Sequence, residues 1–247
     1  MCRTMCAVVW MCLVGSVGAG ELTGELKLKS GDSLLRASEA QDAVIYFRSK
    51  QPVVAQPVAQ PQLMTTRRKQ FVPRVLAVAA GESVRFPNDD PILHNVFSAS
   101  PENAFDTGQY GRGEGKTTQF NKPGLVRVYC NVHHSMYGFI LVLDTPFHTR
   151  PDVLGRFKLS GLPEGEGELV IFHDRGAPLR QKVFIQDPTT QETGLKPNGP
   201  TQNQSAPSGA VGARQHLVLT LELNRRKVPS HSNKFGKPYT RSSNASY

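Results

Sequence analysis

The chain has 247 residues, of which 38% are hydrophobic, enough for one large domain or two small ones. Its formal net charge of +9 sits mainly at the ends, since Arg3 and six basic residues after Leu223 leave only about +2 on the rest. The six are Arg225, Arg226, Lys227, Lys234, Lys237 and Arg241. Because the body is nearly neutral and few aromatic residues interleave the basic tail, we expect no nucleic-acid partner.

Residues 1–19 have the pattern of a secretory signal peptide. Arg3 precedes an apolar run from Met5 to Val14, and Val17-Gly18-Ala19 offers the small side chains that a signal peptidase recognises. The run is too short to cross about 30 Å of hydrocarbon. We therefore expect cleavage after Ala19 or Gly20, a periplasmic product and no stable membrane insertion.

The next part of the chain, residues 20–146, is predicted to be a β-sandwich or barrel. Short runs rich in Val, Ile, Phe and Leu alternate with Gly/Pro turns, and no long helical periodicity interrupts them. The predicted strands are Leu22–Lys29, Ala43–Arg48, Val75–Ala79, Ser83–Pro87, Thr117–Phe120, Leu125–Cys130 and Phe139–Leu143. Residues 51–62, rich in Pro and Gln, are expected to form an extended loop.

Residues 147–224 are predicted to form a second, smaller β-sandwich. Three strands are expected between residues 155 and 185, and "HLVLTLEL" (216–223) supplies one more. The Pro/Gly/Gln/Asn-rich residues 187–214 are expected to be a flexible loop between them. Residues 225–247 lack apolar periodicity, which predicts a disordered basic tail.

Cysteine placement raises the question of function. Cys2, Cys6 and Cys12 fall within the predicted signal peptide, so the mature chain keeps only Cys130. An exported chain with one cysteine uses it as a free thiol, an intermolecular bridge or a metal ligand. The two-residue period of the strand Leu125–Cys130 points Cys130 inward.

Cys130, His133 and Met136 form a Cys-x2-His-x2-Met pattern in "YCNVHHSMYGF" (129–139). Thiolate, imidazole and thioether together are soft ligands, which select copper over hard cations. Two histidines and one cysteine with a long axial methionine make a blue-copper centre. The loop "FPNDDPILHNVFS" (86–98) offers His94 as the second histidine.

These motifs resemble the cupredoxin family, in particular plastocyanin and amicyanin, and within it secreted bacterial methylamine-utilisation proteins. The resemblance implies a Greek-key β-sandwich in which His94, Cys130, His133 and Met136 bind one type 1 copper. It also implies that Asn95 braces the ligand loops. His134 stands where related loops often have Pro, and we expect it to be exposed. The second sandwich resembles a carboxypeptidase-regulatory-like domain.

The resemblance predicts a non-enzymatic protein that transfers one electron to or from a redox partner protein. A periplasmic copper carrier without a redox role is the alternative. A zinc hydrolase would need an open coordination position and a general base, for which the sequence offers only Asp89 and Asp90 near His94. A structural β module that has lost its copper site is the last alternative, although all four ligand types are present.

Overall fold

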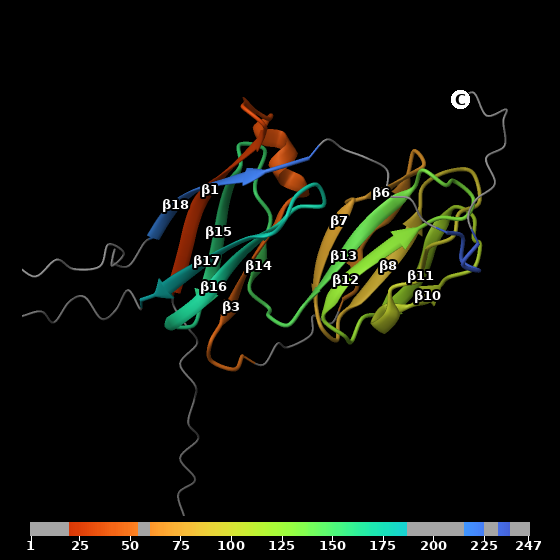
Figure 1. Ribbon diagram of the computed structural model, residues 1–247. Helices are drawn as coiled ribbons and strands as arrows, with labels where there is room; N and C mark the ends of the chain where they lie inside the picture. The colour runs from red at the N-terminus through yellow and green to blue at the C-terminus, as the bar shows by residue number, and fades with distance from the viewer. Residues whose placement is uncertain (1–19, 54–59, 187–214, 225–231, 238–247) are drawn as a thin grey trace, which may run out of the picture.

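The computed structural model describes residues 20–53, 60–186, 215–224 and 232–237 (Figure 1). Within these ranges the fold is all-β, as predicted, and its helical segments are two short 3-10 turns, η1 (Ala37–Asp42) and η2 (Pro101–Asn103). No helix in these ranges is both long and apolar enough to cross a membrane. The predicted signal peptide and the loop 187–214 lie outside the described residues.

Residues 62–143 form the first sandwich, on the right in Figure 1. One sheet has the strand order β10-β9-β12-β13-β7, and the other has β11-β8-β5-β6 with β4 paired to β8. The strands are β4 (Gln62–Leu63), β5 (Thr65–Arg67), β6 (Gln70–Val72), β7 (Val75–Ala79), β8 (Ser83–Asn88), β9 (Phe97–Ser98), β10 (Phe105–Asp106), β11 (Gly113–Gln119), β12 (Gly124–Tyr129) and β13 (Tyr137–Leu143). Antiparallel pairing of β12 with β13 fixes both ends of the loop that carries Cys130, His133 and Met136.

The second sandwich lies on the left in Figure 1. Its sheets have the orders β15-β1-β18, with β2 paired to β1, and β14-β3-β16-β17. The strands are β1 (Gly20–Ser30), β2 (Ser33–Leu34), β3 (Val44–Ser49), β14 (His148–Thr149), β15 (Arg156–Leu162), β16 (Gly165–Phe172), β17 (Leu179–Ile185) and β18 (Gln215–Glu222). The strands predicted after residue 155 are therefore present.

The sheets divide the chain differently from the expected boundary at residue 146. β1 pairs in parallel with β18, from Leu22 opposite Gln215 to Lys29 opposite Glu222, and β3 pairs with β16. Residues 20–49 thus belong to the second sandwich and not to the first. The error has a physical cause: the alternation within a strand shows which face is buried but not which distant strand is its neighbour.

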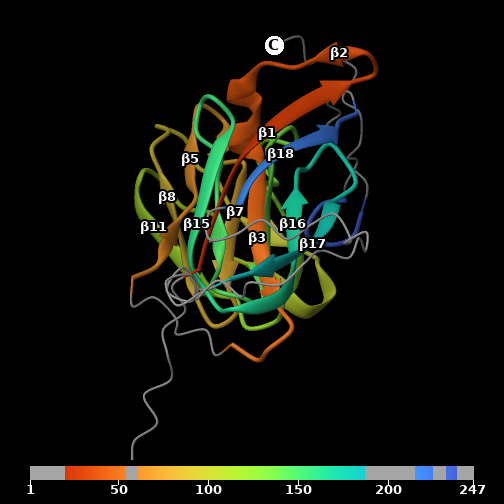
Figure 2. The ribbon, with the colours of Figure 1, turned by 90° about the vertical axis from the view of Figure 1, so that its left-hand side faces the viewer.

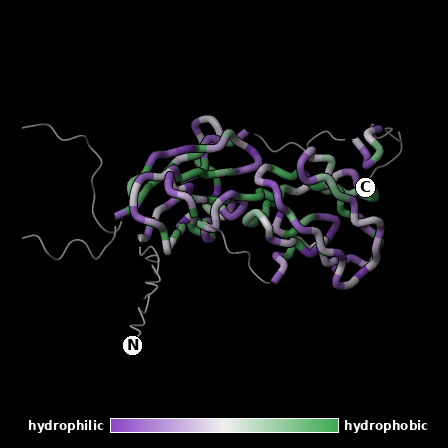
Figure 3. Tube along the Cα trace, turned by 90° about the horizontal axis from the view of Figure 1, so that it is seen from below, coloured by the Kyte–Doolittle hydropathy of each residue, from purple (hydrophilic) through white to green (hydrophobic). Residues whose placement is uncertain are grey.

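The sheet of β3 and β16 packs against the sheet of β7 and β13, so these central strands are largely buried on both faces. In Figure 2 the second sandwich lies in front of the first. An apolar core joins the sheet of β3 and β16 to that of β7 and β13; it comprises Val44, Tyr46, Val75, Ala77, Phe139, Leu141, Leu143, Val170 and Phe172. Two-sided burial explains why β7 and β13 are continuous apolar runs instead of alternating ones. Hydrophobic segments, green in Figure 3, accordingly run through the interior of the molecule.

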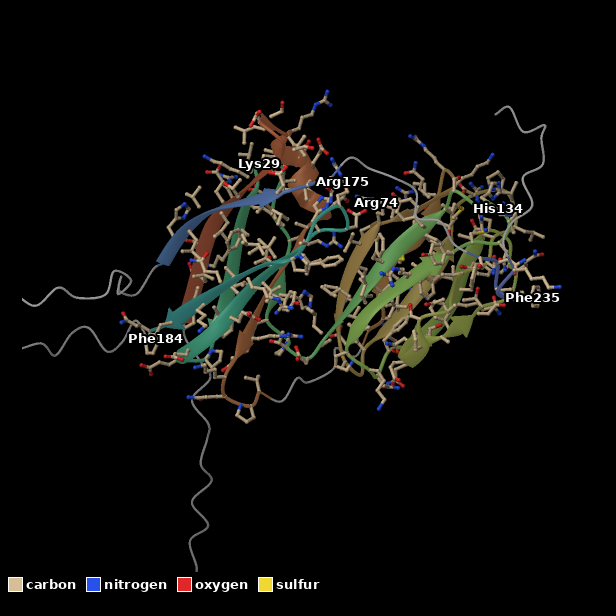
Figure 4. The ribbon with its side chains drawn as sticks, in the orientation of Figure 1. Lys29, Arg74, His134, Arg175, Phe184 and Phe235 are labelled. Atoms are coloured by element: carbon tan, nitrogen blue, oxygen red, sulfur yellow. The ribbon has the colours of Figure 1, made fainter. Side chains whose placement is uncertain are left out.

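A partly buried ionic cluster lies at the edge of this shared core. Arg74, which precedes β7, contacts Asp42 of the second sandwich at 2.5 Å and also pairs with Asp174. Arg74 and Arg175 both project into this region (Figure 4). His173 is fully buried beside them, and its Nδ1 accepts a hydrogen bond from the backbone N–H of Arg175 at 3.1 Å. Arg74 comes from the first sandwich and its two carboxylate partners from the second, so these ion pairs help to orient the two sandwiches.

Candidate metal centre

His94 lies in the loop between β8 and β9, where the backbone holds it firmly. It forms an isolated antiparallel bridge with Tyr110, with N–H to carbonyl distances of 3.1 and 2.9 Å. Tyr110 is itself fixed, because its hydroxyl donates a hydrogen bond of 2.8 Å to the carbonyl of Phe86 in β8. The His94 imidazole is completely buried.

The loop after β12 is tight, as its short length requires. The backbone N–H of Met136 donates to the carbonyl of His133 at 2.9 Å, and that of Cys130 donates to the carbonyl of Met136 at 3.4 Å. Cys130 continues the inward-facing positions of Val126 and Val128, and all three belong to the core between the two sheets. The inward orientation predicted from strand periodicity is therefore observed.

The structure brings the predicted ligand residues together. Cys130 Sγ lies 3.6 Å from Nδ1 of His94, and one atom from each of His94, Cys130 and His133 lies within 4.8 Å of the others. The two imidazole rings are 4.9 Å apart between centroids. Met136 is 1% exposed and packs in the same core cluster as Cys130. The separation of up to 4.8 Å between the ligand atoms is slightly larger than the roughly 4 Å that metal–ligand bond lengths lead us to expect.

One atom of this group fits a metal particularly well. Nδ1 of His133 is buried and has no hydrogen-bond partner. Leaving a polar atom buried and unpaired costs about 1–3 kcal/mol, and a bound cation would remove that cost. Burial lowers the pKa of both His94 and His133, and the charge of a protonated His94 would lower the pKa of His133 further. Both effects favour the neutral imidazole, which is the form that binds metals.

Asp90 orients the His94 ring by contacting Nε2, the ring nitrogen that does not face Cys130. The sequence analysis did not assign this role to Asp90. Its carboxylate is 3.1 Å from Nε2 of His94 and accepts backbone hydrogen bonds from Arg68 and Lys69 at 2.6 and 2.8 Å. Burial alone would raise the pKa of Asp90, but these hydrogen bonds lower it overall. An ionised Asp90 places the imidazole proton on Nε2 and leaves Nδ1 free to face Cys130. The spacing Asp-x3-His was the available signal.

Asn95 connects the two ligand loops. Its Oδ1 accepts a hydrogen bond of 2.8 Å from the backbone N–H of Asn131, the residue after Cys130. Its Nδ2 donates to Oδ1 of Asp106 at 3.2 Å. Asn95 thus ties the residue next to His94 to the residue next to Cys130, which is the position of the brace that the resemblance implied.

The other histidines that the structure describes take no part in this group. His134 is exposed, as predicted, whereas its neighbour His133 is half-buried. Among the described residues, His148, His173 and His216 belong to no cluster of metal-binding groups. His231 lies outside the described residues.

The comparisons with known proteins give only distant likenesses. No protein-family model and no curated protein matches the chain. Among solved structures, a purple cupredoxin from Nitrosopumilus maritimus is 20% identical, with a TM-score of 0.31, over 33% of this chain and 99% of that one. A reduced amicyanin mutant is 18% identical, with a TM-score of 0.33, over 40% and 98%. A copper-containing nitrite reductase from Thermus scotoductus is 28% identical, with a TM-score of 0.34, over 38% of this chain and 26% of that one.

Proposed function

We propose that this chain is a type 1 copper protein that transfers one electron at a time. His94, Cys130 and His133 would hold one copper ion through two imidazoles and a thiolate, and the thioether of Met136 would be a weaker fourth ligand. The observation that carries the proposal is that His133 lies in one group with an imidazole and a thiol and has a buried, unpartnered Nδ1. When bound, copper would supply a one-electron couple at this site.

The chain's own contribution is rigidity. His94 is held through its backbone by Tyr110 and through its ring by Asp90. Cys130 is held by β12 and, through Asn131, by Asn95. Ligands fixed in this way cannot rearrange freely between two oxidation states, and small rearrangement favours fast electron transfer. The shared apolar core with the second sandwich stiffens β13, on which the ligand loop ends.

The half-buried His133 is the ligand through which an electron would enter or leave. It is flanked by exposed Val132 and exposed His134, whereas His94, Cys130 and Met136 are buried. A redox partner protein docking on this edge would come close to the site without displacing any ligand. Export to the periplasm through the N-terminal signal peptide completes the proposal.

The alternatives have less support. A zinc hydrolase would need a free general base, but the Asp90 carboxylate already contacts Nε2 of His94 and accepts hydrogen bonds from two backbone N–H groups. Copper carriage without a redox role uses the same ligands and remains the second candidate. A carrier benefits from ligands that open for release, whereas these are held from several sides.

Titration of Cu(II) into the purified mature protein tests the proposal. We expect one equivalent to bind, with an intense visible charge-transfer band from the Cys130 thiolate and the electron paramagnetic resonance of a type 1 site. Binding of one equivalent without that band would favour the carrier function. No tight binding would overturn both.

A further inference from the structure

The C-terminal segment Ser232–Lys237 forms a compact turn with its own hydrogen bonds. Oδ1 of Asn233 accepts from the backbone N–H groups of Phe235 and Lys237 at 3.0 and 3.1 Å. The backbone N–H of Asn233 donates to the carbonyl of Lys237 at 2.8 Å, and Gly236 takes the φ of +75° that closes the turn. The segment therefore has a defined shape, although it falls within residues 225–247, which the sequence predicted to be disordered.

This turn lies on the first sandwich, although β18, the last strand before it, belongs to the second (Figure 1). Phe235, in the turn, and His134, in the ligand loop, project at the same end of the molecule (Figure 4). Lys234 makes the contacts. Its backbone N–H donates to Oδ1 of Asn131 at 3.1 Å, and its Nζ donates to Oδ2 of Asp106 at 2.6 Å.

Asp106 and Asn131 are the two groups that Asn95 joins. The four residues therefore close a ring of hydrogen bonds. Lys234 donates to Asp106 through Nζ and to Asn131 through its backbone N–H, and Asn95 donates to Asp106 and accepts from Asn131. Burial would raise the pKa of Asp106, but Lys234, the Gly108 backbone and Asn95 lower it overall, so the carboxylate in the ring is ionised.

We propose that Lys234 is a positioning residue for the metal centre, which holds the His94 loop and the Cys130 loop together by closing this ring. The proposal rests on the proposed function for its consequence, slow loss of copper. Without the Lys234 side chain, the ring would open, and Asp106 would lose its cationic partner. A charge-assisted hydrogen bond is stronger than a neutral one, so its removal should be felt by the other members of the ring.

Hydrogen exchange in the metal-free protein tests the ring directly. The reporter is the backbone N–H of Asn131, which donates to Asn95. We expect Lys234→Ala to speed its exchange by about threefold to tenfold, and Lys234→Arg to restore slow exchange because arginine can still pair with Asp106. Lys237→Ala removes the same charge from the same turn and should leave the exchange unchanged. Equal exchange in Lys234→Ala and Lys237→Ala would overturn the proposal.

Copper release provides the second readout. With an excess of a Cu(I) chelator, we expect Lys234→Ala to lose copper about threefold to tenfold faster than Lys237→Ala and Lys234→Arg. If Asn131 exchanges faster in Lys234→Ala but copper release is unchanged, Lys234 is a structural residue and the positioning role is wrong. If the Asn131 N–H exchanges faster in Lys234→Ala but the native protein binds no copper, the ring still links the two loops. The proposed copper function would then be wrong.

Discussion

Cys130 Sγ lies 3.6 Å from Nδ1 of His94, although 36 positions of the chain separate the two residues. His94 follows β8 in one sheet, and Cys130 follows β12 in the other. The two loops leave the same end of the sandwich, where Asn95 joins them. The geometry at this end therefore depends on the packing of the two sheets and on a small set of polar contacts.

The adjacent histidines 133 and 134 should behave differently. His133 offers a buried Nδ1 to the ligand group, whereas His134 is exposed. We expect His133→Ala to abolish the visible spectrum of the copper form and His134→Ala to leave it nearly unchanged. Absorption spectra of the two variants with one equivalent of Cu(II) check this. The opposite result would make His134 the ligand.

Asp90 should matter more than Asp89. Asp90 is buried against Nε2 of His94, whereas Asp89 pairs with Arg67 at the surface. Replacing a group that orients a metal-binding histidine typically lowers metal affinity about 10- to 100-fold. We expect an effect of that size for Asp90→Asn and almost none for Asp89→Asn, measured by competition with a copper chelator. Equal affinities would show that Asp90 does not orient His94.

His173 should make the fold sensitive to acid. Burial, with Arg74 and Arg175 nearby, lowers its pKa from 6.5 to about 4. His173 of the unfolded chain then takes up a proton at a higher pH than His173 of the folded chain. Neutral His173 therefore makes its whole contribution to the free energy of unfolding above about pH 7, and this contribution is lost as the pH drops toward 4. The loss is on the order of 3 kcal/mol.

Urea denaturation at pH 7 and pH 4.5 measures this effect. His173→Leu should lose less stability between the two pH values than the native protein does, and the difference isolates His173 from the other titrating groups. Substitution of the exposed His216 by Gln is the control and should keep the native dependence. An unchanged pH dependence in His173→Leu would show that His173 does not titrate in this way.

Cys130→Ser tests the role of the sulfur itself. The side chain is completely buried among Val126, Val128 and Met136, so a substitution of similar size should leave the sandwich folded. Oxygen is a harder ligand than sulfur, so we expect the charge-transfer band to disappear. Circular dichroism would verify the fold and absorption spectroscopy the band. A variant that kept the band would show that Cys130 is not the thiolate ligand.

The local features of the site could be predicted from the sequence. Cys130, His133 and Met136 lie within one hairpin loop, so their proximity needs no long-range folding. The two-residue period of β12 was enough to point Cys130 inward. The loop 86–98 offered His94 as the second histidine, and its position near Cys130 follows from both loops leaving the same end of the sandwich.

Contacts between distant segments could not be predicted in the same way. Nothing local in Leu22–Lys29 shows that its partner is β18. For β3 the sequence carried one sign, because its continuous apolar run indicates burial on both faces. The contact of Lys234 with Asp106 joins residues 128 positions apart. A lysine in a basic, apolar-poor tail carries no signal of such a contact, so the ring around Asn95 emerges only from the folded chain.

Cyclic voltammetry of the copper-loaded native protein, with Cys130→Ser as the control, tests the central claim most directly. Our account predicts a reversible one-electron wave for the native protein, because the ligands are held in place by Asp90, Tyr110 and Asn95. The variant should show no such wave. A native protein that binds copper tightly through Cys130 but gives no reversible wave would contradict electron transfer and leave copper carriage as the function.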